Sequence, residues 1–180
     1  MRVATIRRTM RIITFAIAST TLMSCLVTDS IDNTQPRNYP SSVVSTPDAV
    51  YPLNRIVQIN RDEVTEDLEF DVIIRDANVK TRLQTQVFVI RRDGTSIFVP
   101  QQLNNTISPT MTESVERSTT IRVQVGFLGD SGCVKIELLV SQEFLDVRVP
   151  VEEGDVHSAV WWVAVTSSGG EPIDLRGCTQ

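Results

Sequence analysis

Hydrophobic and polar residues alternate along much of the chain after residue 54. The clearest run is 121–127, where Ile121, Val123, Val125 and Phe127 are separated by polar or small residues. Successive side chains of an extended chain point to opposite faces, so this period of two predicts a strand with one buried face. We predict further strands by the same argument at 55–59, 68–75, 83–90, 96–99, 134–140, 145–151 and 159–166.

The predicted strands are short and are separated by turn-forming residues, as in Arg92-Asp93-Gly94. Four consecutive apolar residues at 87–90 indicate a strand that is covered on both faces. No stretch beyond residue 24 keeps a helical period for three turns, and a parallel sheet needs helical crossovers. We therefore predict an all-β, mainly antiparallel domain over residues 52–180, packed as a two-sheet sandwich.

The number and spacing of these strands resemble the immunoglobulin-like domains of bacterial extracytoplasmic proteins. The resemblance covers residues 52–180 and implies a single antiparallel immunoglobulin-like sandwich of about seven strands. The Cys-Trp-Cys signature of true immunoglobulin domains is absent from the sequence.

The first 24 residues have a different pattern. Arg2, Arg7, Arg8 and Arg11 precede the apolar run 12–23, and this segment contains no Asp or Glu. That layout is typical of a secretory signal peptide. A membrane-spanning helix needs roughly 20 apolar residues, more than this run provides.

The leader ends in Leu22-Met23-Ser24-Cys25, which resembles the bacterial lipobox. The resemblance implies cleavage between Ser24 and Cys25, a diacylglycerol on the Cys25 thiol, and acylation of the new amino terminus. Such acyl chains together hold a protein firmly on a bilayer. Met23 departs from the usual Ala, Ser or Thr. Leu26 stands where an inner-membrane lipoprotein typically has Asp, so we expect the outer membrane.

Two other interpretations of the leader stay open. It is alternatively an ordinary signal peptide in which Cys25 is incidental, or a twin-arginine signal built on Arg7 and Arg8. After the leader, residues 25–51 are polar and contain three prolines without a sustained period, which predicts a flexible tether. The predicted organisation is thus a signal peptide at 1–24, a lipidated Cys25 with its tether to residue 51, and one domain.

The charge balance argues against nucleic acid as a partner. Four of the 17 Lys and Arg lie in the leader, which leaves 13 against 22 Asp and Glu, a net charge of −9 for the mature chain. An acidic exterior repels phosphate backbones.

Three cysteines are an odd number for an exported protein. With Cys25 acylated, Cys133 and Cys178 are left, and an oxidising compartment favours a disulfide between them. In the chain-entropy model this bond contributes roughly 4 kcal/mol. Two free thiols and a metal site are the alternatives, but two cysteines and one histidine without close spacing do not make a zinc site.

Candidate catalytic and metal-binding residues are few. Gly129-Asp130-Ser131-Gly132 resembles the nucleophile motif of chymotrypsin-like proteases, but the only histidine, His157, lies downstream rather than upstream. We therefore interpret this motif as a turn. Carboxylates at 62–67 and 152–155 leave open a calcium site between loops, although neither segment has an EF-hand spacing. We expect no catalytic residues, cofactor or metal.

Trp161 and Trp162 are neighbours on a predicted strand, so their rings must point to opposite faces. Trp161 shares its parity with Val163 and Val165, which predicts that it lies in the core. Trp162 is then the candidate partner contact, because indole rings supply a large contact area in interfaces. Alternatively, the ring packs beneath a loop, the tether or the carboxyl-terminal tail.

These observations predict a membrane-anchored extracytoplasmic lipoprotein. We expect it to be a non-catalytic binding or structural module that contacts the membrane through its lipid and engages an envelope protein or surface. A hydrolase of envelope polymers and a carrier of small apolar ligands are the alternatives. A hydrolase needs paired acid and base groups in a cleft, and a carrier needs an enclosed cavity between its sheets.

Overall fold

The computed structural model describes residues 41–53, 55–100, 106–110, 114–167, 173 and 175–178, and this part of the chain is all-β. The predicted leader, Ser24, Cys25 and the tether up to residue 40 lie outside the described residues. Within them, no helix is long and apolar enough to cross a membrane.

The described residues form eleven strands and two short 3-10 helices. The strands are β1 (Ser42–Ser45), β2 (Ile56–Asn60), β3 (Leu68–Arg75), β4 (Leu83–Arg91), β5 (Ser96–Val99), β6 (Thr106–Ile107), β7 (Glu116–Val123), β8 (Gly132–Ser141), β9 (Phe144–Asp146), β10 (Val149–Pro150) and β11 (His157–Thr166). The 3-10 helices are η1 (Val125–Leu128) and η2 (Leu175–Cys178).

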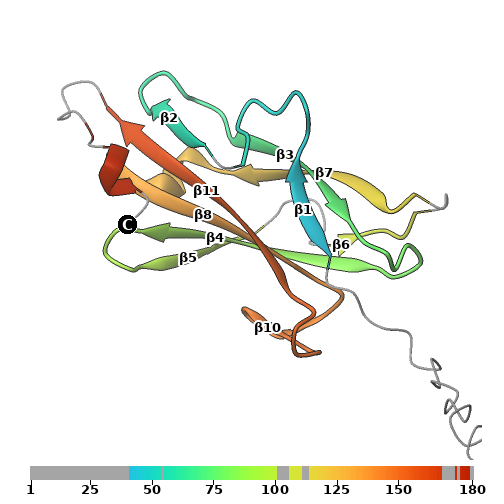
Figure 1. Ribbon diagram of the computed structural model, residues 1–180. Helices are drawn as coiled ribbons and strands as arrows, with labels where there is room; N and C mark the ends of the chain where they lie inside the picture. The colour runs from blue at the N-terminus through green and yellow to red at the C-terminus, as the bar shows by residue number, and fades with distance from the viewer. Residues whose placement is uncertain are drawn as a thin grey trace, which may run out of the picture. The chain divides into compact units, whose positions relative to one another are not determined.

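The strands form two main sheets and a separate hairpin (Figure 1). One sheet has the order β1-β3-β7, and the larger sheet has the order β2-β11-β8-β4-β5, with β6 paired to β4. Strands β9 and β10 pair only with each other among the described residues. In the described part of the chain, every strand pairing is antiparallel except that of β2 with β11, so the prediction of mainly antiparallel strands is confirmed.

Both main sheets contribute to one hydrophobic core. Strand β3 alternates buried and more exposed residues, and its Phe70 ring lies 4.9 Å from the Trp161 ring of β11, centroid to centroid. Both side chains are fully buried. Trp161 donates a 3.0 Å hydrogen bond from Nε1 to the carbonyl oxygen of Tyr51, so its one polar group is satisfied. Burying a large apolar side chain stabilises the fold by about 1.5–3 kcal/mol.

The folded region begins earlier than predicted. Ser42–Ser45 form β1, which pairs antiparallel with β3, so the prediction of a tether extending to residue 51 is wrong at its carboxyl-terminal end. Only Val43 of this strand is buried. A short strand with serine at both ends gives almost no alternating hydrophobic signal, which is why the pattern missed it.

Two of the predicted strands differ from those in the structure. The run 121–127 leaves the sheet after Val123 and continues as η1, followed by Gly129 at φ 86°. The run 145–151 is not one strand, because the chain reverses at Val147 and Arg148 and forms the β9–β10 hairpin. Neither residue at this reversal is a common turn former, so the sequence carried no turn signal.

Candidate functional site

The two neighbouring tryptophans of β11 occupy opposite faces of the larger sheet. Trp161 is fully buried, as predicted, whereas Trp162 is partly exposed. In the register of the sheet, Trp162 lies between Ile56 of β2 and Lys135 of β8. The indole of Trp162 is therefore presented on the outer face of the sheet, where a partner can reach it.

Two surface hollows on one side of Trp162 share lining residues and form one depression, which we call the trough and which is lined mostly by apolar residues. The first has a volume of about 460 Å³ and lies between Trp162, Val160 and His157 of β11 and Leu53, Arg55 and Ile56. The second, also about 460 Å³, shares Val43, Leu53 and Arg55 with the first. The trough opens here because β2 pairs with β11 only from Trp162 onward.

A smaller hollow of about 170 Å³ lies on the other side of Trp162. Its polar lining is cationic, from Arg91, Arg92 and Lys135, and the Cys133–Cys178 pair closes it. Lys135 also forms a 3.2 Å ion pair with Glu137. None of the described residues that line this hollow or the trough is Asp or Glu. In a chain with a formal net charge of −5, the charged residues lining this hollow beside Trp162 are thus basic rather than acidic.

His157 stands at one end of the trough and is uncharged at neutral pH. Burial lowers the pKa of its imidazole below the ordinary value of 6.5, because desolvation disfavours the charged form. Arg55 is then the one permanent charge that lines the trough among the described residues.

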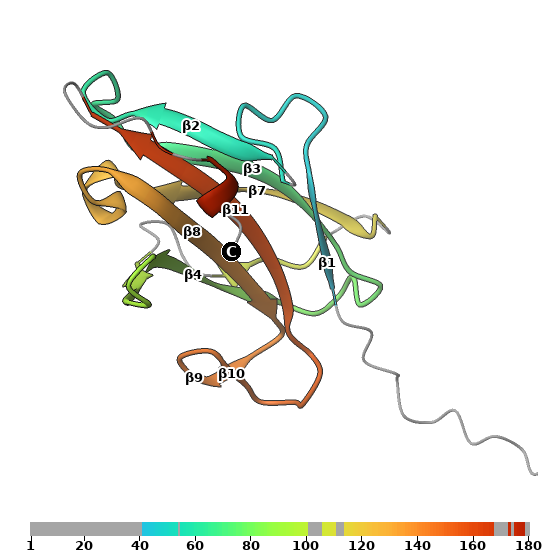
Figure 2. The same cartoon turned by 60° about the vertical axis from the view of Figure 1, so that its left-hand side comes forward.

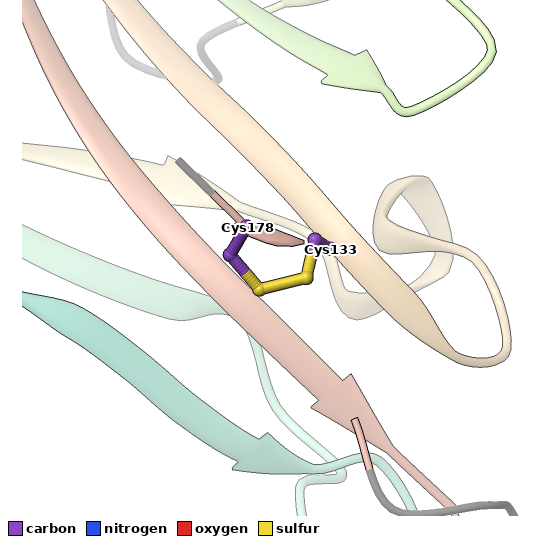
Figure 3. Close-up of a disulfide and its surroundings, with 2 residues drawn as sticks. All are labelled: Cys133 and Cys178. Atoms are coloured by element: carbon purple, nitrogen blue, oxygen red, sulfur yellow. A yellow bond between two sulfur atoms is a disulfide. The ribbon is translucent and has the colours of Figure 1, made fainter. Parts of the chain in front are cut away.

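The disulfide between Cys133 and Cys178 ties the carboxyl-terminal segment to the edge of this site (Figure 3). The two Cα atoms are 5.1 Å apart, and Cys178 is buried. Cys133 pairs in register with Ala164, so the tail that follows β11 has only to turn back for Cys178 to meet it. The predicted pairing is confirmed.

The structure places Ser131 of the protease-like motif far from His157. Gly132, next to Ser131, pairs with Val165 at one end of the β8–β11 ladder, whereas His157 pairs with Val140 at the other end. Eight residues of extended chain span roughly 26 Å, so Ser131 and His157 cannot share a proton.

The carboxylates do not converge on a metal site in the described part of the chain. No group of three or more His, Cys, Asp or Glu there is arranged to hold a metal ion. Asp155 of the 152–155 cluster is buried and accepts hydrogen bonds from Ser141 Oγ at 2.7 Å and from the Gln142 amide at 2.8 Å. This carboxylate therefore anchors a loop.

Sequence reasoning found Trp162 but missed the residues that form the trough around it. Leu53 lies just after the predicted tether and close to Arg55 and Ile56, and the pattern gave no reason to bring these residues against β11. The parallel pairing of β2 with β11 makes that contact, and parallel pairing leaves no local signature. No family model matches the chain, and neither does any curated protein.

Proposed function

We propose that the chain is a lipid-anchored extracytoplasmic lipoprotein that acts as a non-catalytic binding module at the outer membrane. The lipobox-like Leu22-Met23-Ser24-Cys25 supports the anchor. The Cys133–Cys178 disulfide supports an oxidising compartment, because such bonds persist outside the reducing cytosol. It also accounts for the odd cysteine count, since Cys25 is the one that remains for acylation.

The strand order supports an immunoglobulin-like arrangement of the domain. In that fold, strands A, B and E lie in one sheet and strands C, F and G in the other. The order β1-β3-β7 matches A-B-E, and β4-β8-β11 matches C-F-G. The departure is the disulfide, which joins β8 to η2 rather than joining the two sheets.

The observation that carries the binding role is the position of Trp162. Its indole stands partly exposed between the trough and the cationic hollow, while the neighbouring indole fills the core. Exposed aromatic residues flanked by concave apolar surface are typical of the residues that dominate binding energy. A partner of this face would present apolar groups together with negative charge, because the charged side chains lining the hollows are cations.

Cross-linking in living cells, followed by mass spectrometry of the captured proteins, tests this proposal. Trp162→Ala should lower the yield of the specific adducts at least about tenfold, the effect of losing an interfacial anchor. Val115→Ala is the matched control, because Val115 is exposed at the start of β7, away from the trough. Equal adduct yields in the wild type and Trp162→Ala would exclude this face as the binding site.

Metabolic labelling with palmitate tests the anchor separately. The wild type should incorporate the label and partition with outer-membrane vesicles, and Cys25→Ala should do neither. A wild-type protein that takes up no label would remove the lipid anchor from the proposal, whatever the result of the Trp162 experiment.

A further inference from the structure

The β9–β10 hairpin projects from the larger sheet near the end of the β8–β11 ladder (Figure 2), and its tip lies over the outer face of that sheet. It presents apolar side chains to solvent: Leu145, Val147, Val149 and Val151 are between 47% and 75% exposed. Single exposed apolar residues are ordinary, but four within seven positions form a contiguous strip. Such a strip on a projecting element indicates an interaction surface.

Arg148 clamps the tip of the hairpin to the outer face of the larger sheet. Its guanidinium lies over the Phe88 ring of β4, 3.9 Å from the centroid. The same group forms an ion pair with Glu137 of β8 and donates a 3.0 Å hydrogen bond to Ser96 Oγ of β5. Phe88 is buried beneath this clamp, so the predicted cover on both faces of β4 is confirmed.

The backbone of the tip is held as firmly as its side chain. Arg148 has φ 65°, the only positive φ at a non-glycine position in the described residues. Its amide donates a 2.8 Å hydrogen bond to Gln86 Oε1, and the amide of Phe144 donates one of 3.2 Å to Gln84 Oε1. A strained conformation persists only where surrounding contacts impose it. The apolar strip is therefore already ordered before it meets a partner, which reduces the entropy cost of binding.

The rim of this strip is acidic. Glu143, Asp146, Glu152 and Glu153 are exposed around it, and the only cation between residues 142 and 156 is Arg148, which is paired with Glu137. Anionic lipid headgroups would repel such a rim. The hairpin fits an apolar depression whose charged residues are cations.

The trough has these properties, and it belongs to the same chain. Most of the residues that line it are apolar, although about half of the exposed lining is polar, and its one permanent charge among the described residues is Arg55. Arg92 and Lys135, the second of which is paired with Glu137, line the hollow on the other side of Trp162. A hairpin cannot enter the trough of its own chain, because its contacts fix it to β4, β5 and β8, whereas the trough lies at β11 and β2.

We propose that the β9–β10 hairpin of one copy docks into the trough of a second copy. This inference rests on the proposed function, since it identifies the partner of the Trp162 face as the chain itself. The two surfaces differ, so the contact is heterologous and produces either a reciprocal pair or an open row of molecules. Anchoring on one membrane would raise the effective concentration of the copies and favour the contact.

Site-specific cross-linking between two differently tagged full-length copies tests the contact in cells. One copy carries Leu145→Cys in the hairpin, the other Leu53→Cys in the trough, and a short bismaleimide reports their proximity. The mixed adduct should form at least about tenfold more than in the control, Val115→Cys with Leu53→Cys. Equal yields from both combinations, or no adduct from either, would overturn the proposal.

Charge reversal provides a second measurement that does not depend on thiol reactivity at one position. Arg55→Glu in the trough copy places a carboxylate opposite the acidic rim and should lower the Leu145→Cys adduct about tenfold. Lys80→Glu, at an exposed lysine outside the trough, is the matched control and should leave the yield unchanged. Loss of the adduct in both variants would show a non-specific charge effect and contradict docking in the trough.

The two proposals fail in different ways. If no copy-to-copy adduct forms but Trp162→Ala still abolishes capture of other envelope proteins, the proposed binding role is retained and the proposed self-association is rejected. A retained Cys133–Cys178 disulfide, read from the mass change on reduction, shows that each variant has folded.

Discussion

The two ends of the β8–β11 ladder hold their adjoining segments in opposite ways. At one end, beside Gly132 and Val165, a covalent bond from Cys133 to Cys178 holds η2. The other end lies beside Val140 and His157. There, residues 142–156, which include the β9–β10 hairpin, are held by hydrogen bonds, an ion pair and a cation–π contact. The first end depends on one strong constraint and the second on several weak ones.

This difference matters for function because the two ends respond to different conditions. The disulfide is broken by reduction and is insensitive to moderate changes of pH. The polar contacts of the hairpin end each contribute about 0.5–3 kcal/mol, and those made by Asp155, Glu137 and the Arg148 guanidinium involve charged groups. If the hairpin binds a partner, its binding surface is thus the end of the domain that charge and pH can adjust.

The largest expected effect is at the covalent end. Replacing both Cys133 and Cys178 by serine should lower the free energy of unfolding by about 4 kcal/mol, because the bond closes a loop of 45 residues in the unfolded chain. Urea unfolding of the variant and the wild type measures the difference. Hydrogen exchange in residues 143–151 should stay unchanged, since those contacts lie at the other end of the ladder.

A loss of less than about 1 kcal/mol would contradict this prediction and would mean that the unfolded chain is little constrained by the bond. Faster exchange throughout the hairpin would instead show that the two ends are coupled. The two ends of the ladder would then not be stabilised independently.

The intermediate effect is at the base of the hairpin. Asp155→Asn keeps the shape of the side chain but replaces one carboxylate oxygen by an NH₂ group and removes the charge, so at least one of the bonds from Ser141 Oγ and the Gln142 amide is weakened. We expect a loss of about 1–3 kcal/mol, concentrated in residues 142–156 and measurable as faster hydrogen exchange there. The exposed Glu153→Gln is the matched control and should change stability little.

Unchanged hydrogen exchange in the Asp155→Asn variant would show that the hydrogen bonds of Asp155 do not hold the base of the hairpin. Slower exchange would indicate that burying the Asp155 charge costs more than its hydrogen bonds return.

The two ends also differ in how far the sequence predicted them. The cysteine count and the expected oxidising compartment were enough to pair Cys133 with Cys178. The hairpin was predicted as one strand because Arg148 adopts a positive φ only through contacts with Gln86, Ser96 and Glu137. Those residues lie 11 to 62 positions from Arg148 in the chain, and no local sequence pattern predicts these contacts.

The candidate site was predictable to the same limited degree. Parity along β11 identified Trp161 as the core ring and left Trp162 for the outer face, because a period of two is a local property. The trough needs a chain crossing from β1 to β2 that brings Leu53 and Arg55 beside β11. Such a long-range arrangement is fixed by the packing of two sheets and leaves no trace in the spacing of these residues.

The smallest expected effect concerns His157, where the hairpin end meets the trough. Burial lowers the pKa of the folded imidazole below 6.5, so the unfolded chain binds a proton first as the pH falls. The contribution of His157 to stability is therefore fully present above pH 6.5 and is lost as the pH falls through the folded pKa. His157→Gln removes the titrating group and should flatten the pH dependence of stability in that window.

Urea unfolding at several pH values from about 7.5 to about 5 measures this, with the exposed neighbour Ser158→Ala as the control. Because the variant and the wild type differ at this residue alone, the difference between their stabilities at each pH reports on His157. Wild-type stability that rose relative to His157→Gln as the pH fell would mean that the folded state favours the imidazolium, and that an anionic group reaches His157.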